Sequence, residues 1–496
     1  MRTWAAAATL AAWLLVVSAG SAGSVLPTTI SNDPYTNTGP QHRTQVEPDS
    51  FAFGQTIVAL TQSGRYYGGG GASNLVYASS QNGGRTWTTG GLPGTTVNQG
   101  GPWPRISDPS IAYDPQDGVW LALGLGIDSG GTGHILLVNR SINGGVTWTN
   151  PVTAAESTGS FWDKTWITCD TWAASQYYGN CYIQYDDNTA GNAMRMVTST
   201  DGGLTWGPIR TPDCSSGLGG QPVVQPNGTV VVPYSNNGGA ISTFRSTDGG
   251  ANWGGCTTIA SVQEHGVAAN IRTFALPSAE VAGDGKVYVA WQDCRFRAGC
   301  PANDIVYSTS LDGLAWSSVT RIPIDATGSG VDHFLPGIAV DRATSGGSTH
   351  LAVGYYYFPN AACSVSTCQL TVGFTSSLDG GATWTAGRAL TGPMNVPWIA
   401  FTNQGYMVGD YISTSFTSDG KAHPVFSWAK APNSGPATSC YPSNITVCNQ
   451  RMASVSIDIT VPSVAVAKSE TGPVFLQRTG QKRTLPKRSA RLVTAN

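Results

Sequence analysis

The sequence predicts an all-β protein whose four-stranded antiparallel sheets form a β-propeller of six or seven blades, seven by the count of motifs. Three observations predict this fold. One phrase containing glycine and tryptophan recurs six times, and short apolar runs bounded by Gly, Asp and Asn surround each copy, as is typical of strands. The chain also holds 62 glycines and only 11% charged residues, a composition that fits a turn-rich β protein better than a helical one.

The recurring phrase predicts a tight hairpin. Its usual form is Ser, any residue, Asp or Asn, Gly, Gly, any residue, Thr or Asn, and Trp. An Asn or Asp side chain can accept nearby backbone N–H groups, and glycine adopts a positive φ without strain, so Asn-Gly-Gly and Asp-Gly-Gly favour turns. The copies begin about 47 to 67 residues apart, which is room for four short strands. The copies occupy residues 80–87, 141–148, 199–206, 246–253, 310–316 and 377–384, and the fifth is one residue short.

This phrase resembles the Asp-box, or bacterial neuraminidase repeat, and its six copies over residues 45 to 460 resemble the sialidase superfamily. The resemblance implies a sialidase-like glycoside hydrolase that cleaves a terminal sugar at the central mouth of the propeller. Asp-boxes also occur in polysaccharide lyases and in non-catalytic glycan-binding propellers. Because a fold does not determine a function, these two readings stay open as alternatives.

The ends of the chain differ in composition from its body. Residues 1–23 have the charged start, apolar core and small-residue end of a secretory signal peptide, which predicts a secreted, extracellular protein. We expect an N-terminal extension over 24–44, the propeller over 45–462, and a basic tail over 463–496 that is disordered from about 477. No later apolar run is long enough for a membrane anchor, and a net charge of −2 argues against nucleic acid. We expect a monomer.

Ten cysteines in a chain predicted to be exported indicate disulfides before metal ligands. Their positions fall into sequential neighbours, although the sequence alone does not prove connectivity. The expected pairs are Cys169 with Cys181, Cys214 with Cys256, Cys294 with Cys300, Cys363 with Cys368, and Cys440 with Cys448.

The first strand of each blade lines the central axis, so the residues that begin these strands should meet at one mouth of the ring, opposite the boxes. Most of these positions carry acids, so the sequence predicts a ring of carboxylates around one opening. The positions are Glu47, Asp108, Asp163, Gln221, the region of Arg272, Asp332 with His333, and Asp410 with Tyr411.

Crowded carboxylates cannot all ionise freely, so one of them can stay protonated near neutral pH and act as a general acid. The candidate catalytic residues are Glu47, Asp108, Asp163, Asp410 and Tyr411. The plainer alternative is that these acids cap backbone N–H groups or hold a structural Ca²⁺. No cofactor is expected to be required.

The resemblance to sialidases also implies an arginine clamp for a substrate carboxylate, a tyrosine nucleophile and an aspartate acid. On this chain the clamp would be Arg43, Arg105 and Arg272, the nucleophile Tyr411 or Tyr355, and the acid Asp108 or Asp163. Lys164 and His333, which lie beside predicted mouth acids, are further candidates for substrate binding.

One departure from the sialidase pattern concerns the first clamp arginine. Sialidases carry Arg-Ile-Pro ahead of the first box, whereas the only such tripeptide here begins at Arg321, after the fifth box, where we expect it to be a coincidence. The partner is therefore expected to be a glycan whose terminal sugar is acidic or neutral.

Overall fold

The fold is seen in a computed structural model of the chain, which describes residues 26–213, 216–432, 440, 448–459 and 466–467. The predicted signal peptide, nearly all of the predicted basic tail and Cys214 lie outside the described residues.

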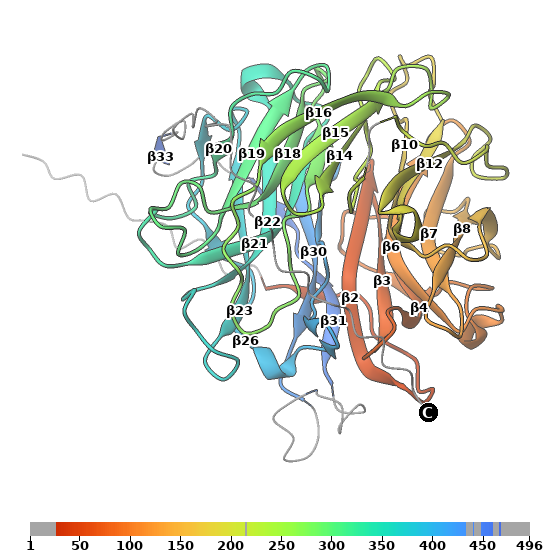
Figure 1. The fold of residues 1–496 in the computed structure, drawn as a ribbon, viewed down its shortest axis with the longest axis horizontal. Helices are drawn as coiled ribbons and strands as arrows, with labels where there is room; N and C mark the ends of the chain where they lie inside the picture. Colours follow the sequence, from red (N-terminus) through yellow and green to blue (C-terminus); the bar gives the residue numbers. More distant parts are fainter. Residues whose placement is uncertain (1–25, 214–215, 433–439, 441–447, 460–465, 468–496) are drawn as a thin grey trace, which may run out of the picture.

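The described chain is all-β, as predicted, and its sheets are arranged as a β-propeller (Figure 1). Among the described residues, five sheets have four or more strands, and the only helical segments are short 3-10 turns. These turns are η1 (Val97–Gln99), η2 (Asn188–Ala190), η3 (Gly346–Ser348) and η4 (Val396–Trp398).

Within each unit of the propeller the strands pair antiparallel and in chain order. The first unit is β2 (Pro40–Phe53), β3 (Thr56–Tyr66), β4 (Ala72–Ser80) and β5 (Thr88–Gly91). The second is β6 (Arg105–Asp114), β7 (Val119–Ile127), β8 (Gly133–Ser141) and β9 (Val152–Glu156), and one pairing of β4 with β6 merges the two units into a single sheet. Next come β10 (Trp162–Cys169), β11 (Cys181–Asp187) and β12 (Ala193–Ser199).

The following units repeat the same order. They are β13 (Val223–Val224), β14 (Val230–Asn236), β15 (Ala240–Ser246) and β16 (Gly254–Ser261), then β17 (Ser278–Val281), β18 (Val287–Asp293), β19 (Asp304–Ser310) and β20 (Thr320–Arg321). After these come β21 (Asp332–Val340), β22 (Leu351–Phe358), β23 (Gln369–Ser377) and β25 (Arg388–Ala389), with β26 (Met394–Asn395) also on β23. Two small sheets pair β24 (Thr383–Trp384) with β33 (Val466–Ala467) and β27 (Phe401–Thr402) with β28 (Gly405–Tyr406).

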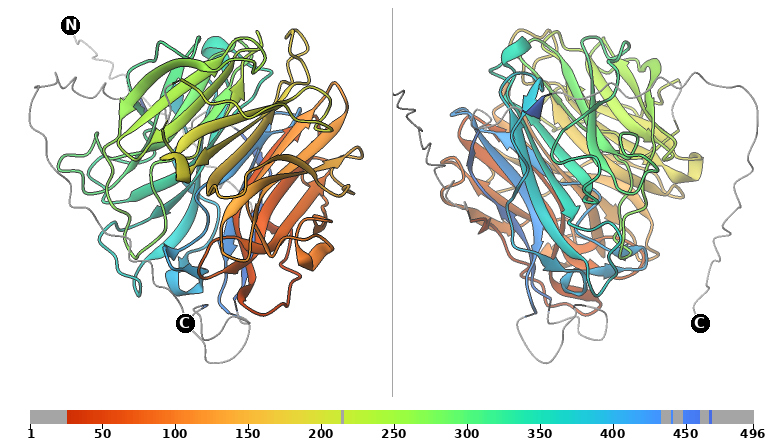
Figure 2. Two further views of the ribbon diagram at one scale, coloured as in Figure 1. Left: turned by 45° about the vertical axis from the view of Figure 1, so that its right-hand side comes forward. Right: turned by 90° about the vertical axis from the view of Figure 1, so that its left-hand side faces the viewer.

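The two ends of the described chain close the ring in one sheet. This sheet joins β29 (Ser413–Phe416), β30 (Lys421–Ala429), β31 (Gln450–Ser454) and β32 (Ile457–Asp458) to the N-terminal β1 (Thr28–Thr29), which pairs with β31. Residues 28 and 29, which belong to the predicted N-terminal extension, therefore form a strand of this last sheet. Figures 1 and 2 show the red β2 beside the blue β30, where the first and last sheets meet.

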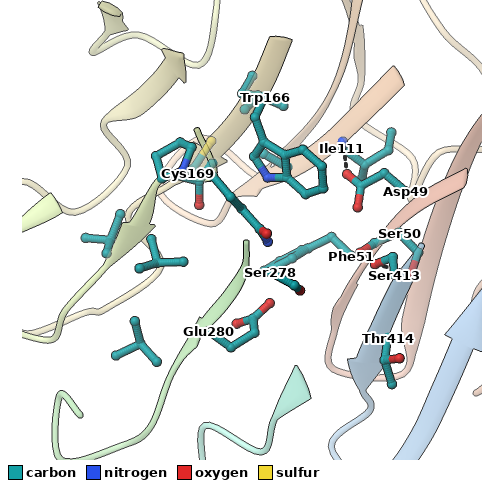
Figure 3. A pocket seen from close by; sticks show the side chains of 18 of the residues that line it. Asp49, Ser50, Phe51, Ile111, Trp166, Cys169, Ser278, Glu280, Ser413 and Thr414 are labelled. Atoms are coloured by element: carbon teal, nitrogen blue, oxygen red, sulfur yellow. Dashed lines mark hydrogen bonds between the residues drawn. The ribbon is translucent and has the colours of Figure 1, made fainter. Parts of the chain in front are cut away.

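A narrow void of about 50 Å³ lies on the axis of the ring. Its wall is formed by β2, β6, β10, β13, β17, β21 and β29 and the residues next to them, so first strands from all around the ring face one channel. Figure 3 shows side chains from several of these strands, including Asp49 and Glu280, around this void. The first strands therefore line the axis, as the sequence predicts.

The repeated phrase forms the predicted hairpins. In the first copy, Ser80 Oγ accepts a hydrogen bond from Gly84 N (2.9 Å), and Asn82 Oδ1 accepts one from Thr86 N (3.0 Å). The indole Nε1 of Trp87 donates to Gly84 O (3.0 Å). The same three bonds recur in the second, fourth and sixth copies. In the shortened fifth copy, the buried Nε1 of Trp316 has no partner among the described residues.

We expect the carboxylate of the sixth hairpin, Asp379, to stabilise the fold by a modest amount. It accepts hydrogen bonds from Thr383 N (2.8 Å), Thr383 Oγ1 (2.6 Å) and Ser377 Oγ (2.8 Å). Burial raises the pKa of Asp379, but these bonds outweigh burial and lower it. Asp379→Ala should therefore reduce the free energy of unfolding by about 1–2 kcal/mol at neutral pH.

The expected loss of stability in Asp379→Ala should shrink as the pH falls, because a depressed pKa stabilises the fold above the unfolded-state pKa and not below it. Denaturant unfolding of both proteins at neutral and acid pH measures this difference. A loss that is the same at both pH values would contradict the account.

Four of the five predicted disulfides are present. They are Cys169–Cys181, Cys294–Cys300, Cys363–Cys368 and Cys440–Cys448, and each closes a short loop or joins neighbouring strands. The partner predicted for Cys256, Cys214, lies outside the described residues. Four disulfides fit an extracellular protein.

Within the described part of the chain, no helix has the length and apolar character needed to span a lipid bilayer.

Candidate functional site

Several first strands carry a β-bulge, and each bulge turns one residue out of the regular strand. The pairing register shifts in β2, β6, β10 and β21. The displaced residues are Glu47, Asp108, Lys164 and Leu335, and each has a left-handed backbone with φ between 49° and 54°. Strained backbone of this kind in residues other than glycine is concentrated at functional sites.

The bulged residues Glu47 and Asp108 face a hollow of about 180 Å³, which we call the acidic hollow. Asp163, Arg65 and Arg272 also line it. The rest of its wall is polar, aromatic, aliphatic or glycine: Gly69, Gly70, Ser107, Leu125, Ile127, Gly131, Gly133, Phe161, Trp162, Asn403, Gln404 and Met407. The structure thus places three of the predicted catalytic acids around one opening.

Asp410 is a fully buried carboxylate with two cationic partners. Arg272 Nε donates to Asp410 Oδ1 (2.8 Å), and Arg272 and Lys164 both form ion pairs with Asp410 Oδ2. Burial raises the pKa of Asp410, but the charges of Arg272 and Lys164 outweigh burial and hold it well below the usual range. Asp410 therefore stays ionised, and it already uses both oxygens.

Glu47 has the opposite protonation behaviour. It is 1% exposed, Gln62 Nε2 donates to its Oε2, and the backbone N–H of Asp410 donates to its Oε1 (3.3 Å). Burial and then the negative charge of Asp410 raise the pKa of Glu47 to about 8, against the smaller opposing effect of Lys164. The carboxyl of Glu47 is therefore mostly protonated at neutral pH.

The other acids near the hollow differ in exposure. Asp163 keeps 34% of its side chain exposed, and its Oδ1 lies 3.9 Å from Lys164 Nζ. Asp108 is buried, and it accepts hydrogen bonds from Ser107 Oγ (2.9 Å) and Thr165 N (3.3 Å). Burial and the charge of Asp163 raise the pKa of Asp108. Asp163 is therefore the most accessible carboxylate of the hollow, while Asp108 is enclosed.

The structure places the other predicted site residues outside the acidic hollow. Arg43 is exposed, and its backbone N–H donates to Asp33 Oδ2 (2.7 Å). Arg105 donates to Gly68 O (2.7 Å) and stacks over the ring of Tyr66 at 3.9 Å, so its guanidinium is bonded to the glycine loop and does not line the hollow.

Tyr411 does not line the hollow either. Its hydroxyl donates to Pro109 O (2.9 Å) and its ring packs edge-on against Trp166. Burial, followed by the charge of Glu47, raises the pKa of Tyr411 well above 10. The alternative nucleophile, Tyr355, is 2% exposed and packs against His333.

His333 lies in a second charged cluster, away from the acidic hollow. Its Nδ1 faces Asn303 O at 3.3 Å, and ligand atoms of His333, Asp304 and Asp325 lie within 4.8 Å of one another. Arg297 and Arg321 each form ion pairs with both of these carboxylates, at 2.7 to 3.0 Å. The two arginines already compensate the acids, so this cluster does not fit a Ca²⁺ site. Arg321, the first residue of the Arg-Ile-Pro tripeptide after the fifth box, is thus a buried cation with a structural role.

Sequence reasoning missed three residues of the site, all on second strands. Arg65 and Gln62 lie on β3, and Asp186 lies on β11 opposite Asp163. Burial, followed by the charge of Arg272, lowers the pKa of Arg65 to about 10, and burial raises that of Asp186 well above its usual value. One feature of the sequence could have revealed these residues: each is a charged or amide side chain within a strand that is otherwise buried.

The fold and this site define a β-propeller with a charged, partly enclosed hollow at one mouth of its axis. No family model matches the chain, and a search of curated proteins found no match. Solved structures that it resembles include the NanB sialidase of Streptococcus pneumoniae, at 15% identity and a TM-score of 0.42, covering 87% of this chain and 70% of that one.

Two further similar structures belong to other organisms. The intramolecular trans-sialidase of Ruminococcus gnavus is 15% identical with a TM-score of 0.42, over 87% of this chain and 98% of that one. The α-L-arabinanase of Penicillium chrysogenum is 14% identical with a TM-score of 0.42, over 88% and 98%. The chemistry of this chain is therefore inferred from its own side chains.

Proposed function

We propose that this protein is a secreted glycoside hydrolase with a sialidase-like scaffold, which removes a terminal sugar bound in the acidic hollow. The observation that carries the proposal is the pairing of Glu47, protonated at neutral pH, with the accessible carboxylate of Asp163 on one hollow. Two carboxyl groups in different environments are the catalytic groups of most glycosidases. The disulfides support the assignment to an extracellular protein.

In the proposed reaction Glu47 is the general acid. Its proton passes to the glycosidic oxygen as the bond from that oxygen to the anomeric carbon breaks. Asp163 supplies the second carboxylate: it either takes a proton from the attacking water or attacks the anomeric carbon itself. Asp108 lies beside both groups, and it is enclosed by hydrogen bonds that fix its orientation.

The cations next to the hollow have a supporting role in this proposal. Arg272 and Lys164 keep Asp410 ionised, and the charge of Asp410 favours the protonated form of Glu47. Arg65, on the wall of the hollow, would bind an acidic or hydroxyl group of the sugar.

A polysaccharide lyase is less well supported, because a lyase needs a base that is free to take a proton. The hydroxyl of Tyr411 donates to a backbone carbonyl, and its raised pKa disfavours the phenolate. Lys164 is buried, and the charges of Asp163 and Asp410 outweigh burial and raise its pKa, so it stays protonated. A hydrolase therefore fits these side chains better.

We also propose that the ring has seven blades, the number favoured by the count of motifs. The support is the channel wall, which takes residues from β2, β6, β10, β13, β17, β21 and β29 or next to them, one first strand for each unit. The last unit lacks a box and is completed by β1.

The test of the function is a screen of the secreted protein on aryl glycosides of acidic and neutral sugars and on uronate polymers. Released phenol reports hydrolysis, and ultraviolet absorbance of an unsaturated product reports a lyase. The proposal expects phenol release without the ultraviolet product. Binding of glycans with no turnover of any substrate would overturn the proposal in favour of a binding propeller.

The pH dependence of hydrolysis should reflect Glu47. Since the reaction needs its protonated form and its pKa is raised to about 8, kcat/KM should fall as the pH rises through about 8. Measuring kcat/KM on one glycoside over a range of pH values tests this fall. A fall near pH 4 to 5, about the ordinary pKa of a glutamate, would contradict the assignment of Glu47 as the acid.

A further inference from the structure

A second cavity lies at the opposite end of the propeller axis, and nothing in the proposed reaction uses it. It has a volume of about 300 Å³ and shares no lining residue with the acidic hollow. It lies where the first strands end, next to the turn at Gly54 and to residues 339–343 and 415–418. We call it the distal cavity. A volume of this size accommodates a small organic molecule.

The charged groups of the distal cavity are one cation and two acids. Arg342, Glu280 and Asp341 line it, and Arg342 and Glu280 also line the axial channel, where Figure 3 shows Glu280. Asp341 is already engaged: it accepts from Ala343 N (3.1 Å) and lies 3.5 Å from His350 Nδ1. Glu280 is therefore the only other charged group on the described wall of the cavity that is available to interact electrostatically with Arg342.

Arg342 is held in place but lacks an ionic partner. Its guanidinium lies over the ring of Trp172 at 4.2 Å, and its Nη1 donates to Thr171 Oγ1. Within the part of the chain that the structure describes, it forms no ion pair within 4 Å, although Glu280 and Asp170 act on it from further away. A planar guanidinium that is fixed and unpaired beside a cavity matches the fork of a carboxylate.

The remaining wall is largely apolar. Phe51, Phe53, Ala339, Val340 and Phe416 line the distal cavity, and Phe53 is 41% exposed. An inorganic anion would leave this surface unfilled, whereas an organic acid would cover it while its charged end meets Arg342.

We propose that the distal cavity is a second binding site of this protein, which takes a small organic monocarboxylate on the guanidinium of Arg342. Glu280 makes the site dependent on pH. Burial, opposed by Arg342 and reinforced by Asp49, raises the pKa of Glu280 to about 7. Below pH 7 Glu280 is mostly neutral and Arg342 is free for the ligand, whereas above pH 7 the carboxylate of Glu280 competes with it.

The test is calorimetric titration of the full secreted chain with benzoate, at a pH well below 7 and again well above 7. We expect saturable binding that is about tenfold tighter at the lower pH, the effect of one competing charge. Arg342→Gln should abolish it, and Glu280→Gln should remove the pH dependence. The matched control is Arg85→Gln. Arg85 is an exposed arginine that is distant in sequence from Arg342, so this variant should bind benzoate as the wild type does.

Two results would overturn the proposal: no binding of benzoate by the wild type, or equal binding by Arg342→Gln. If Arg342→Gln does not fold, Ala343→Phe replaces it, because Ala343 is an exposed residue of the cavity rim and a phenyl group there obstructs the cavity. Unchanged binding in Ala343→Phe would likewise overturn the proposal. None of these outcomes depends on hydrolysis at the acidic hollow.

Discussion

Glu47→Gln should lower kcat for hydrolysis by about 10²- to 10⁴-fold, the usual contribution of a general acid. The amide keeps the size of the side chain and can still hydrogen-bond to Gln62 and to the backbone of Asp410, but it cannot deliver an acidic proton. The loss should be much smaller for a glycoside with a dinitrophenyl leaving group, which departs without protonation. Steady-state kinetics on a matched pair of poor and good leaving groups measure both effects.

The matched control for this prediction is Glu264→Gln. Glu264 is another glutamate whose pKa is raised, chiefly by desolvation, but it is an exposed residue, it accepts a hydrogen bond from Gln292, and it does not line the acidic hollow. It should lose little activity. Equal losses in the two variants, or a loss in Glu47→Gln that does not depend on the leaving group, would show that Glu47 is not the acid.

Asp410→Asn should lower the free energy of unfolding by about 3–5 kcal/mol, because it removes the buried carboxylate that pairs with both Arg272 and Lys164. The side chains of Asp410 and Lys164 are 0% and 4% exposed, and that of Arg272 is 14% exposed. Denaturant unfolding at neutral pH measures the loss.

Lys164→Met serves as the comparison for Asp410→Asn. Asp410 would keep its two bonds to Arg272 in that variant, so the loss should be smaller. If Asp410→Asn were as stable as the wild type, or if Lys164→Met were the more damaging change, Asp410 would not be the carboxylate that compensates these cations.

The hairpins, strands and disulfides could be predicted because they depend on local sequence. The turn at Asn82 needs only a short polar side chain, glycines and a tryptophan close along the chain, and these residues make its bonds. Cys294 and Cys300 are likewise close in sequence. Six copies of the hairpin phrase at similar spacing then predict a ring of similar sheets.

The register of the first strands was harder to predict. In β10 the bulge displaces Lys164, the residue after the predicted Asp163, and in β21 it displaces Leu335, two residues after the predicted His333. A shift of one or two residues decides which side chain faces the axis. Nothing in the local composition marks the position of a bulge. Glu47, Asp108 and Asp163 line the acidic hollow, whereas His333 does not.

The network under the hollow depends on contacts between distant parts of the chain. Asp410 was predicted as a catalytic acid at the mouth, and the structure instead shows its oxygens bonded to Lys164 and Arg272. Arg65 was missed because it lies on a second strand, which is not expected to face the axis. Such partnerships arise only when the ring closes, so one sequence does not reveal them.

The most direct test of the account is a crystal structure of Glu47→Gln with a glycoside that the wild type hydrolyses. We expect an intact sugar in the acidic hollow, with its glycosidic oxygen at hydrogen-bonding distance from residue 47 and its anomeric carbon toward Asp163. A sugar bound elsewhere on the protein, with the hollow containing only water, would contradict it.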